Sequence, residues 1–144
     1  MGQLTVANYL GLLEEDPDHQ KALEGLRAAL DSGAPSSSEE ALRLLEAARL
    51  GHEHRGELRA AANLLELVAL VVQSAPDRAA AMYQELGRIR HDELLDDEGA
   101  CRAYERALEL RPSDVDTREA LEEIARVGTR WQDIVKALTN EAEG

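Results

Sequence analysis

Apolar residues recur at spacings of three and four along most of the chain. Leu23, Leu26 and Leu30 repeat in this way, and the segment 131–138 carries an i, i+3, i+4, i+7 stripe. Because an α-helix has 3.6 residues per turn, such side chains share one helix face. The β-branched residues, by contrast, cluster in few places, which argues against an all-β fold. The pattern therefore predicts an all-α chain.

Helix start and stop signals divide this pattern into eight predicted helices. Prolines and glycines stand between the apolar stretches, where they favour helix starts and helix ends. Ser37 with Glu40, and Thr129 with Gln132, have the spacing of a capping box. Gly51 is expected to end one helix before a turn at 52–56. The predicted helices are 4–15, 17–31, 39–50, 57–73, 76–95, 97–110, 114–127 and 129–143. The loops between these predicted helices are short, and short loops place consecutive helices antiparallel.

The sequence also contains an internal repeat. Tyr9 precedes Pro17 by 8 residues, Tyr104 precedes Pro112 by 8 residues, and Pro76 and Pro112 lie 36 residues apart. A period of this length is typical of stacked helical hairpins.

The segment 83–112 resembles the tetratricopeptide repeat family. The residues that carry the resemblance are Tyr83, Leu86, Gly87, Ala100, Tyr104 and Pro112, while one aromatic of the family pattern is replaced at Ile89 or Arg90. The resemblance implies an open right-handed α-solenoid of antiparallel helical hairpins. We expect one domain over 1–144, with hairpins at about 39–75, 76–112 and 113–143, preceded by two helices within 4–31.

Two packing arrangements follow from this interpretation. Gly87 and Ala100 are small enough to let the two helices of a hairpin approach closely, and Tyr104 is expected to fill the space between that hairpin and its neighbour. Trp131 leads the apolar stripe of the last predicted helix and is expected to be buried near Leu121 and Ile124.

Both ends of the chain resemble the second half of a hairpin. The segment 9–17 matches the end of a repeat whose first helix is missing, and 131–143 follows the predicted turn at Gly128. Solenoids normally end in polar capping helices. We therefore expect the chain to be a segment of a longer repeat protein.

Charge and composition narrow the choice of partners. The net charge is −13, which argues against nucleic acids and anionic membrane surfaces. We find no apolar run long enough to insert into a membrane and no signal peptide. The single cysteine, Cys101, suits a reducing compartment, and arginine greatly outnumbers lysine. These features favour a bacterial, cytoplasmic protein.

Few residues suggest chemistry. His52 and His54 could hold a metal, but a third ligand is missing, and a solvated turn explains them better. The segment 91–93 is explained as a charged helix end, and Cys101 as a packed structural thiol without a paired histidine. Clustered carboxylates lie at predicted helix ends, where capping accounts for them. We predict a non-enzyme with no catalytic, cofactor-binding or metal-binding residues.

The resemblance implies that the first helix of each hairpin lines a concave groove. The groove would bind a peptide or a helix of another protein. An ordinary solvated face is the alternative explanation for these positions. Two other functions also stay open, a structural segment that self-associates through its end helices and a regulatory domain of a larger multidomain enzyme. The predicted groove residues are Gln84, Arg88, His91, Asp92, Val115, Arg118, Glu122 and Arg126.

Overall fold

The computed structural model describes residues 5–31 and 38–143 of the 144-residue chain. These residues form α-helices and one short π-helix, η1, so the predicted all-α class is confirmed. The serine-rich turn and the Ser37 capping position lie outside the described residues. The elements are α1 (Val6–Glu15), α2 (Gln20–Asp31), α3 (Ser38–His54), α4 (Leu58–Val71), α5 (Pro76–Arg88), η1 (Ile89–Glu93), α6 (Asp97–Leu110) and α7 (Val115–Glu143).

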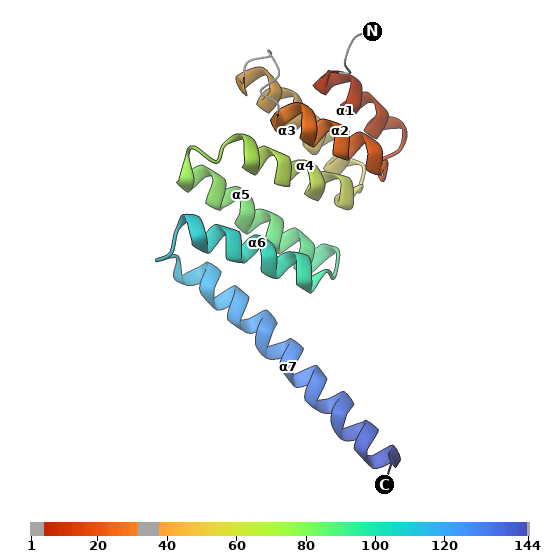
Figure 1. Ribbon diagram of the computed structural model, residues 1–144, viewed down its shortest axis with the longest axis vertical. Helices are drawn as coiled ribbons and strands as arrows, with labels where there is room; N and C mark the ends of the chain where they lie inside the picture. Colours follow the sequence, from red (N-terminus) through yellow and green to blue (C-terminus); the bar gives the residue numbers. More distant parts are fainter. Residues whose placement is uncertain (1–4, 32–37, 144) are drawn as a thin grey trace.

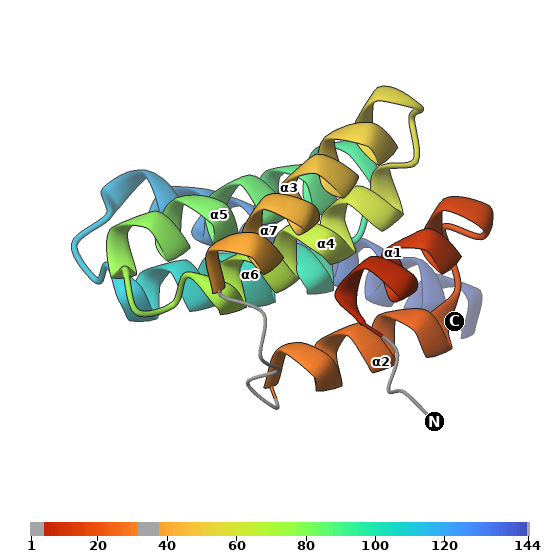
Figure 2. The same ribbon diagram turned by 90° about the horizontal axis from the view of Figure 1, so that it is seen from above.

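The helices form an open stack of antiparallel hairpins, α1–α2, α3–α4 and α5–α6, followed by α7 (Figure 1). Each hairpin packs on the next, since α4 contacts α5 and α6 contacts α7. The first helices also meet, α1 with α3, as do the second helices, α2 with α4. Figure 2 shows α3 and α5 on one side of the stack and α2 and α6 on the other. The predicted open solenoid is therefore confirmed. No helix among the described residues is both long and apolar enough to cross a membrane.

The N-terminal helix has a different role from the one predicted. α1 pairs with α2 and packs on α3, so it opens a hairpin instead of closing one. It has its own start signal, because the Thr5 hydroxyl accepts a hydrogen bond from the Asn8 backbone N–H at 3.2 Å. A side-chain acceptor at this position satisfies a backbone donor that the first turn leaves unpaired.

Two further helices end at other residues than predicted. α3 continues through Gly51 to His54, because the left-handed backbone conformation that ends it falls at Gly56, with φ of +77°. Glycine adopts this conformation without steric cost. The predicted helix 76–95 changes at residue 89 into the π-helix η1, and Leu95 follows with φ of +53°.

The largest difference is at the C-terminal end, where α7 is one continuous helix across Gly128. The predicted turn at Gly128, the Thr129 capping position and the hairpin 113–143 are therefore wrong. A glycine inside a helix costs only about 1 kcal/mol, whereas a break would leave backbone groups to be satisfied elsewhere. The predicted burial of Trp131 is wrong for the same reason. Its side chain is 63% exposed, while Ile124 is buried beside Tyr104 and Ala100.

In two of the hairpins, a close contact between a tyrosine ring and a glycine joins the two helices of that hairpin. A Cβ atom added at Gly87 would lie 2.7 Å from Cε1 of Tyr104, well inside van der Waals contact. Gly25 of α2 has the same relation to the ring of Tyr9 in α1. The prediction for Gly87 and Tyr104 is thus confirmed, and Gly25 adds a second instance that the sequence analysis did not single out.

Gly87→Ala tests this contact, and Gly11→Ala is its matched control. Gly11 lies in α1 with nothing within 4 Å of an added Cβ, so alanine should raise the free energy of unfolding by about 0.5–1 kcal/mol. At Gly87 the same methyl group meets the buried Tyr104 ring, and we expect a net loss of about 1–2 kcal/mol. Urea unfolding followed by circular dichroism measures both. If Gly87→Ala raised the free energy of unfolding as much as Gly11→Ala does, the Tyr104 ring would have to move aside without cost, and the prediction would be wrong.

Candidate functional site

A surface hollow of about 420 Å³ lies where α2, α4, α5 and α6 meet. Its floor is apolar, with Leu70 of α4, Leu86 of α5 and Ala103 of α6. A smaller hollow of about 160 Å³ between α2 and α4 shares Arg27 and Glu66 with it, so the two form one trough along this face.

Four arginines surround the hollow, Arg27, Arg90, Arg102 and Arg106. Arg90 is fixed in place, because its guanidinium contacts the Glu66 carboxylate at 2.5 Å and donates to the Gly99 carbonyl at 3.3 Å.

Arg106 lies over the ring of Tyr83, 5.9 Å from its centre, and forms an ion pair with Glu109. A cation this close to an aromatic face is attracted by the negative face of the ring. Arg106 is therefore positioned at the edge of the hollow by both an ion pair and a ring.

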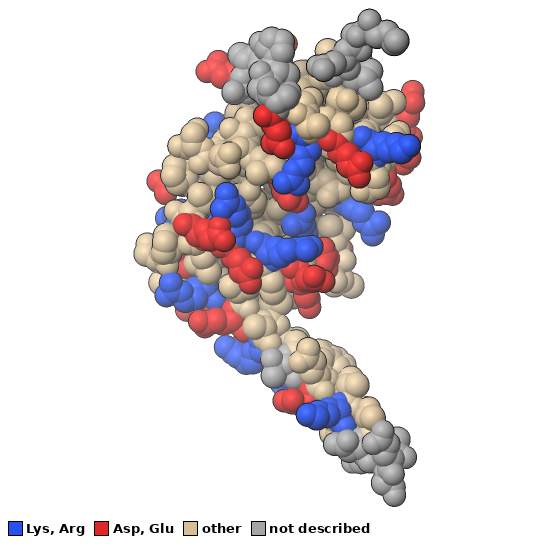
Figure 3. All heavy atoms as spheres, viewed as in Figure 1, with Lys and Arg blue, Asp and Glu red and all other residues tan. Residues whose placement is uncertain are grey.

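Arg27 and Arg102 have more freedom. Arg102 is 68% exposed and 3.9 Å from Glu98, whereas Arg27 is exposed without an ion pair among the described residues. Figure 3 shows basic side chains interspersed with acidic ones in the middle of the face that carries α2 and α6. The two guanidinium groups are thus available to a ligand at the mouth of the hollow.

The predicted groove lies on a different side of α5. At about 100° per residue, Gln84 and Arg88 each lie roughly 160° around α5 from Leu86, which lines the hollow. Gln84 donates hydrogen bonds to Asp114 and Thr117 at the start of α7, so it joins two helices.

Other predicted groove residues also have partners within the chain. Arg88 forms an ion pair with Glu85 at 2.5 Å, which raises the pKa of the guanidinium. His91 Nδ1 lies 2.8 Å from Asp97, and Arg118 donates to the Pro112 carbonyl at 2.6 Å.

The remaining predicted residues are solvent-exposed, namely Asp92, Val115, Glu122 and Arg126. Arg126 forms an ion pair with Glu123 one turn earlier. Glu122 and Arg126 also border a shallow depression of about 640 Å³ whose lining residues all belong to α7. The structure therefore does not gather the eight predicted residues into one hollow.

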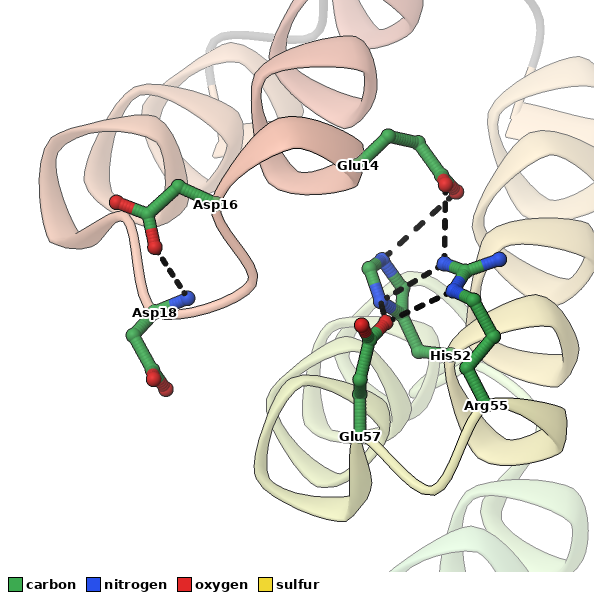
Figure 4. A network of polar contacts seen from close by, with 6 residues as sticks. All are labelled: Glu14, Asp16, Asp18, His52, Arg55 and Glu57. Carbon is green, nitrogen blue, oxygen red and sulfur yellow. Dashed lines mark hydrogen bonds and ion pairs between the residues drawn. The ribbon is translucent and has the colours of Figure 1, made fainter.

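His52 belongs to a different environment from the solvated turn that the sequence analysis favoured. Its side chain is fully buried near the end of α3, and Nδ1 lies 2.8 Å from the Glu57 carboxylate (Figure 4). Arg55 bridges Glu57 at 3.0 Å and Glu14 of α1 at 2.9 Å. His54 is exposed. This network ties α1 to α3 and to the start of α4, so its role is structural.

The other chemical candidates do not form a reactive centre. Burial raises the pKa of the Cys101 thiol, with the carboxylates of Glu105 and Asp97 adding to the effect. A raised pKa keeps the sulfur protonated and weakly nucleophilic at neutral pH. Within residues 5–31 and 38–143, no group of three or more histidine, cysteine or acidic side chains is placed to hold a metal ion.

Comparison with known proteins adds little to this geometry. Neither a family model nor a curated protein matches the chain. Among solved structures, the crystal structure of MamA is similar over 96% of this chain and 87% of that chain, with 19% sequence identity and a TM-score of 0.48. Membership of the tetratricopeptide repeat family therefore stays a prediction from the motif.

Little in the sequence pattern predicts the arginine-lined hollow. Arg102 and Arg106 are one helical turn apart, which places them on one face of α6. Arg27 lies 63 residues from Arg90, however, and the register in which the hairpins stack decides that they meet.

The pKa of Glu57 offers a test of the buried network. The hydrogen bonds from His52 and then Arg55 lower the pKa of this carboxyl. Its contribution to stability is therefore complete above the unfolded value of about 4.3 and is lost as pH falls through the lower folded value. We expect Glu57→Gln to reduce the free energy of unfolding at pH 7 and to have a smaller effect below about pH 4.

Urea unfolding of wild type and variant at several pH values measures this difference. Glu15→Gln is the control, since Glu15 is exposed on α1 without an ion pair among the described residues. A Glu57→Gln effect that is the same at acidic and neutral pH would contradict the ionic role of this carboxylate.

Proposed function

We propose that the chain is a non-catalytic protein-interaction module that binds an extended acidic peptide segment of another protein. The observation that carries the proposal is the arginine-lined, apolar-floored hollow between α2, α4, α5 and α6. In a chain with a net charge of −13, the lining of this hollow carries four arginines and one glutamate, Glu66.

The chemistry of the hollow suits a peptide that combines acidic and apolar side chains. Arginine side chains pair with carboxylates in a bidentate geometry and also donate hydrogen bonds to backbone carbonyls. Leu70, Leu86 and Ala103 supply the apolar floor. Because the rest of the chain repels acidic proteins, the selection of a partner would depend on this patch.

The predicted groove on the first helices is the second candidate surface for the same function. Arg88 and Arg118 are exposed there, but each already has a partner within the chain. A peptide would have to compete with these contacts, whereas Arg27 and Arg102 at the hollow have no ion pair closer than 3.9 Å among the described residues, so we favour the hollow.

A pair of charge reversals separates the two surfaces. Arg27→Glu with Arg102→Glu alters the hollow, and Arg88→Glu with Arg118→Glu alters the predicted groove. Both change the net charge by the same amount, so non-specific repulsion is matched between them. The probe is a fluorescent ten-residue peptide of alternating glutamate and leucine, with a glutamine–leucine peptide as control, followed by fluorescence anisotropy.

We expect the acidic peptide to bind wild type more tightly than the control peptide, and more weakly as salt is added. The Arg27/Arg102 variant should lose at least about tenfold in affinity, or about 1.4 kcal/mol, while the Arg88/Arg118 variant keeps it. Circular dichroism checks that both fold, since exposed charges contribute little to stability. The reverse result would move the site to the predicted groove, and equal binding of the two peptides would refute the selection for acidic segments.

A further inference from the structure

The distal half of α7 carries an exposed apolar seam. Val127, Trp131, Ile134 and Leu138 are 40%, 63%, 43% and 60% exposed. With Ala120 and Ile124 they follow one another at alternating spacings of four and three residues. This is the heptad pattern with which helices pack in coiled coils.

The seam continues an interface that the fold already uses. Ile124 is buried against Ala100 and Tyr104 of α6, and Ala120 packs beside them. α6 begins at Asp97, one turn before Ala100. Because α6 runs antiparallel to α7, the N-terminus of α6 lies where the exposed part of the seam begins, and α6 does not cover α7 any further. Beyond this point α7 extends away from the stack (Figure 1) without a partner among the described residues.

We propose that the distal seam of α7 docks onto the same seam of a second copy of this chain, forming an antiparallel two-helix interface. The partner surface must be a long apolar stripe, and in the described part of the chain the other exposed large apolar residues, Leu50, Leu95 and Val115, lie singly on separate elements. A second α7 therefore fits the seam better than any other described surface of the chain. A two-fold axis near Ile134 places Trp131 of one copy opposite Leu138 of the other.

The residues beside the seam suit close pairing. In the heptad register, Gly128 and Ala137 flank the seam, together with Val135, which is 57% exposed. Small residues at these places allow two helices to approach closely. Arg130 is the charged residue among these flanking places, so little charge is desolvated when the helices meet.

Charge distribution decides the antiparallel orientation. Residues 126–144 contain three basic and three acidic side chains, so the whole net charge of −13 belongs to residues 1–125. A parallel pair would bring two strongly acidic bodies side by side, whereas an antiparallel pair places them at opposite ends. The seam from Val127 to Leu138 is about 18 Å long, so the interface is small compared with specific stable interfaces, whose usual size begins at about 1,200 Å² in total. A concentration-dependent dimer is the expected outcome.

Sedimentation velocity and Trp131 fluorescence over a range of concentrations test the proposal on the full chain. Trp131 is the only tryptophan, so dimerisation should shift its emission to shorter wavelength as the protein is concentrated, and added salt should strengthen the dimer. Small-angle scattering should give a dimer close to twice as long as the monomer. This self-association does not depend on the peptide hollow, and either proposal can fail alone.

Ile134→Glu should weaken the dimer at least 100-fold, because two like charges would face each other at the two-fold axis. Gln132→Glu is the matched control, since it adds the same charge to an exposed place on the other side of α7. Ile134→Lys alone should also be monomeric, and mixing it with Ile134→Glu should restore a heterodimer.

Three results would overturn the proposal. A monomer with exposed Trp131 at all concentrations would leave the seam to another protein. A monomer with buried Trp131 would show that the chain covers its own seam by bending at Gly128, and Gly128→Ala would then expose the tryptophan again. A dimer unaffected by Ile134→Glu would place the interface elsewhere.

Discussion

The stack depends on how closely Tyr104 approaches Gly87. The ring lies where a side chain on α5 would stand, so α5 and α6 can pack this closely only because residue 87 has no side chain. The same ring also contacts the cluster of Ala100 and Ile124 through which α7 joins the stack. Tyr104 therefore fixes the last hairpin and the start of α7 together. The position of α7, and with it the direction of the exposed seam, follows from this contact.

The hollow depends on the same constraint. Arg106 lies one turn beyond Ala103 on α6 and rests on Tyr83 of α5. If α5 and α6 were further apart, the guanidinium would lose the ring and the apolar floor would be divided. The π-helix that follows α5 adds to this arrangement, because it carries Arg90 to Glu66 on α4. Local backbone irregularity thus places the arginine that links two hairpins.

Helix periodicity predicted the fold class and the hairpin order, because apolar spacing reports directly on which face is buried. It failed at glycines, whose effect depends on the surroundings. Gly51 and Gly128 lie inside helices, while Gly56 adopts the left-handed conformation that ends α3. The seam through Trp131 was visible in the sequence, but its spacing cannot say whether a partner covers it. The hollow could not be predicted, since its arginines come from α2, α6 and the π-helix η1, whose stacking register cannot be read from the sequence.

The two proposed surfaces differ in chemistry and lie on different parts of the chain. This separation affects the affinity of a dimer for its partner. The hollow lies on the acidic body, while the seam lies on the neutral end of α7. An antiparallel pair would therefore leave both hollows open, at opposite ends of one particle. Two weak sites held at a fixed distance bind a partner with two acidic segments far more tightly than either site alone, provided that the linker between the segments spans the pair. Self-association through α7 would in this way convert a weak peptide site into a selective one, and the spacing of the segments would become part of the recognition.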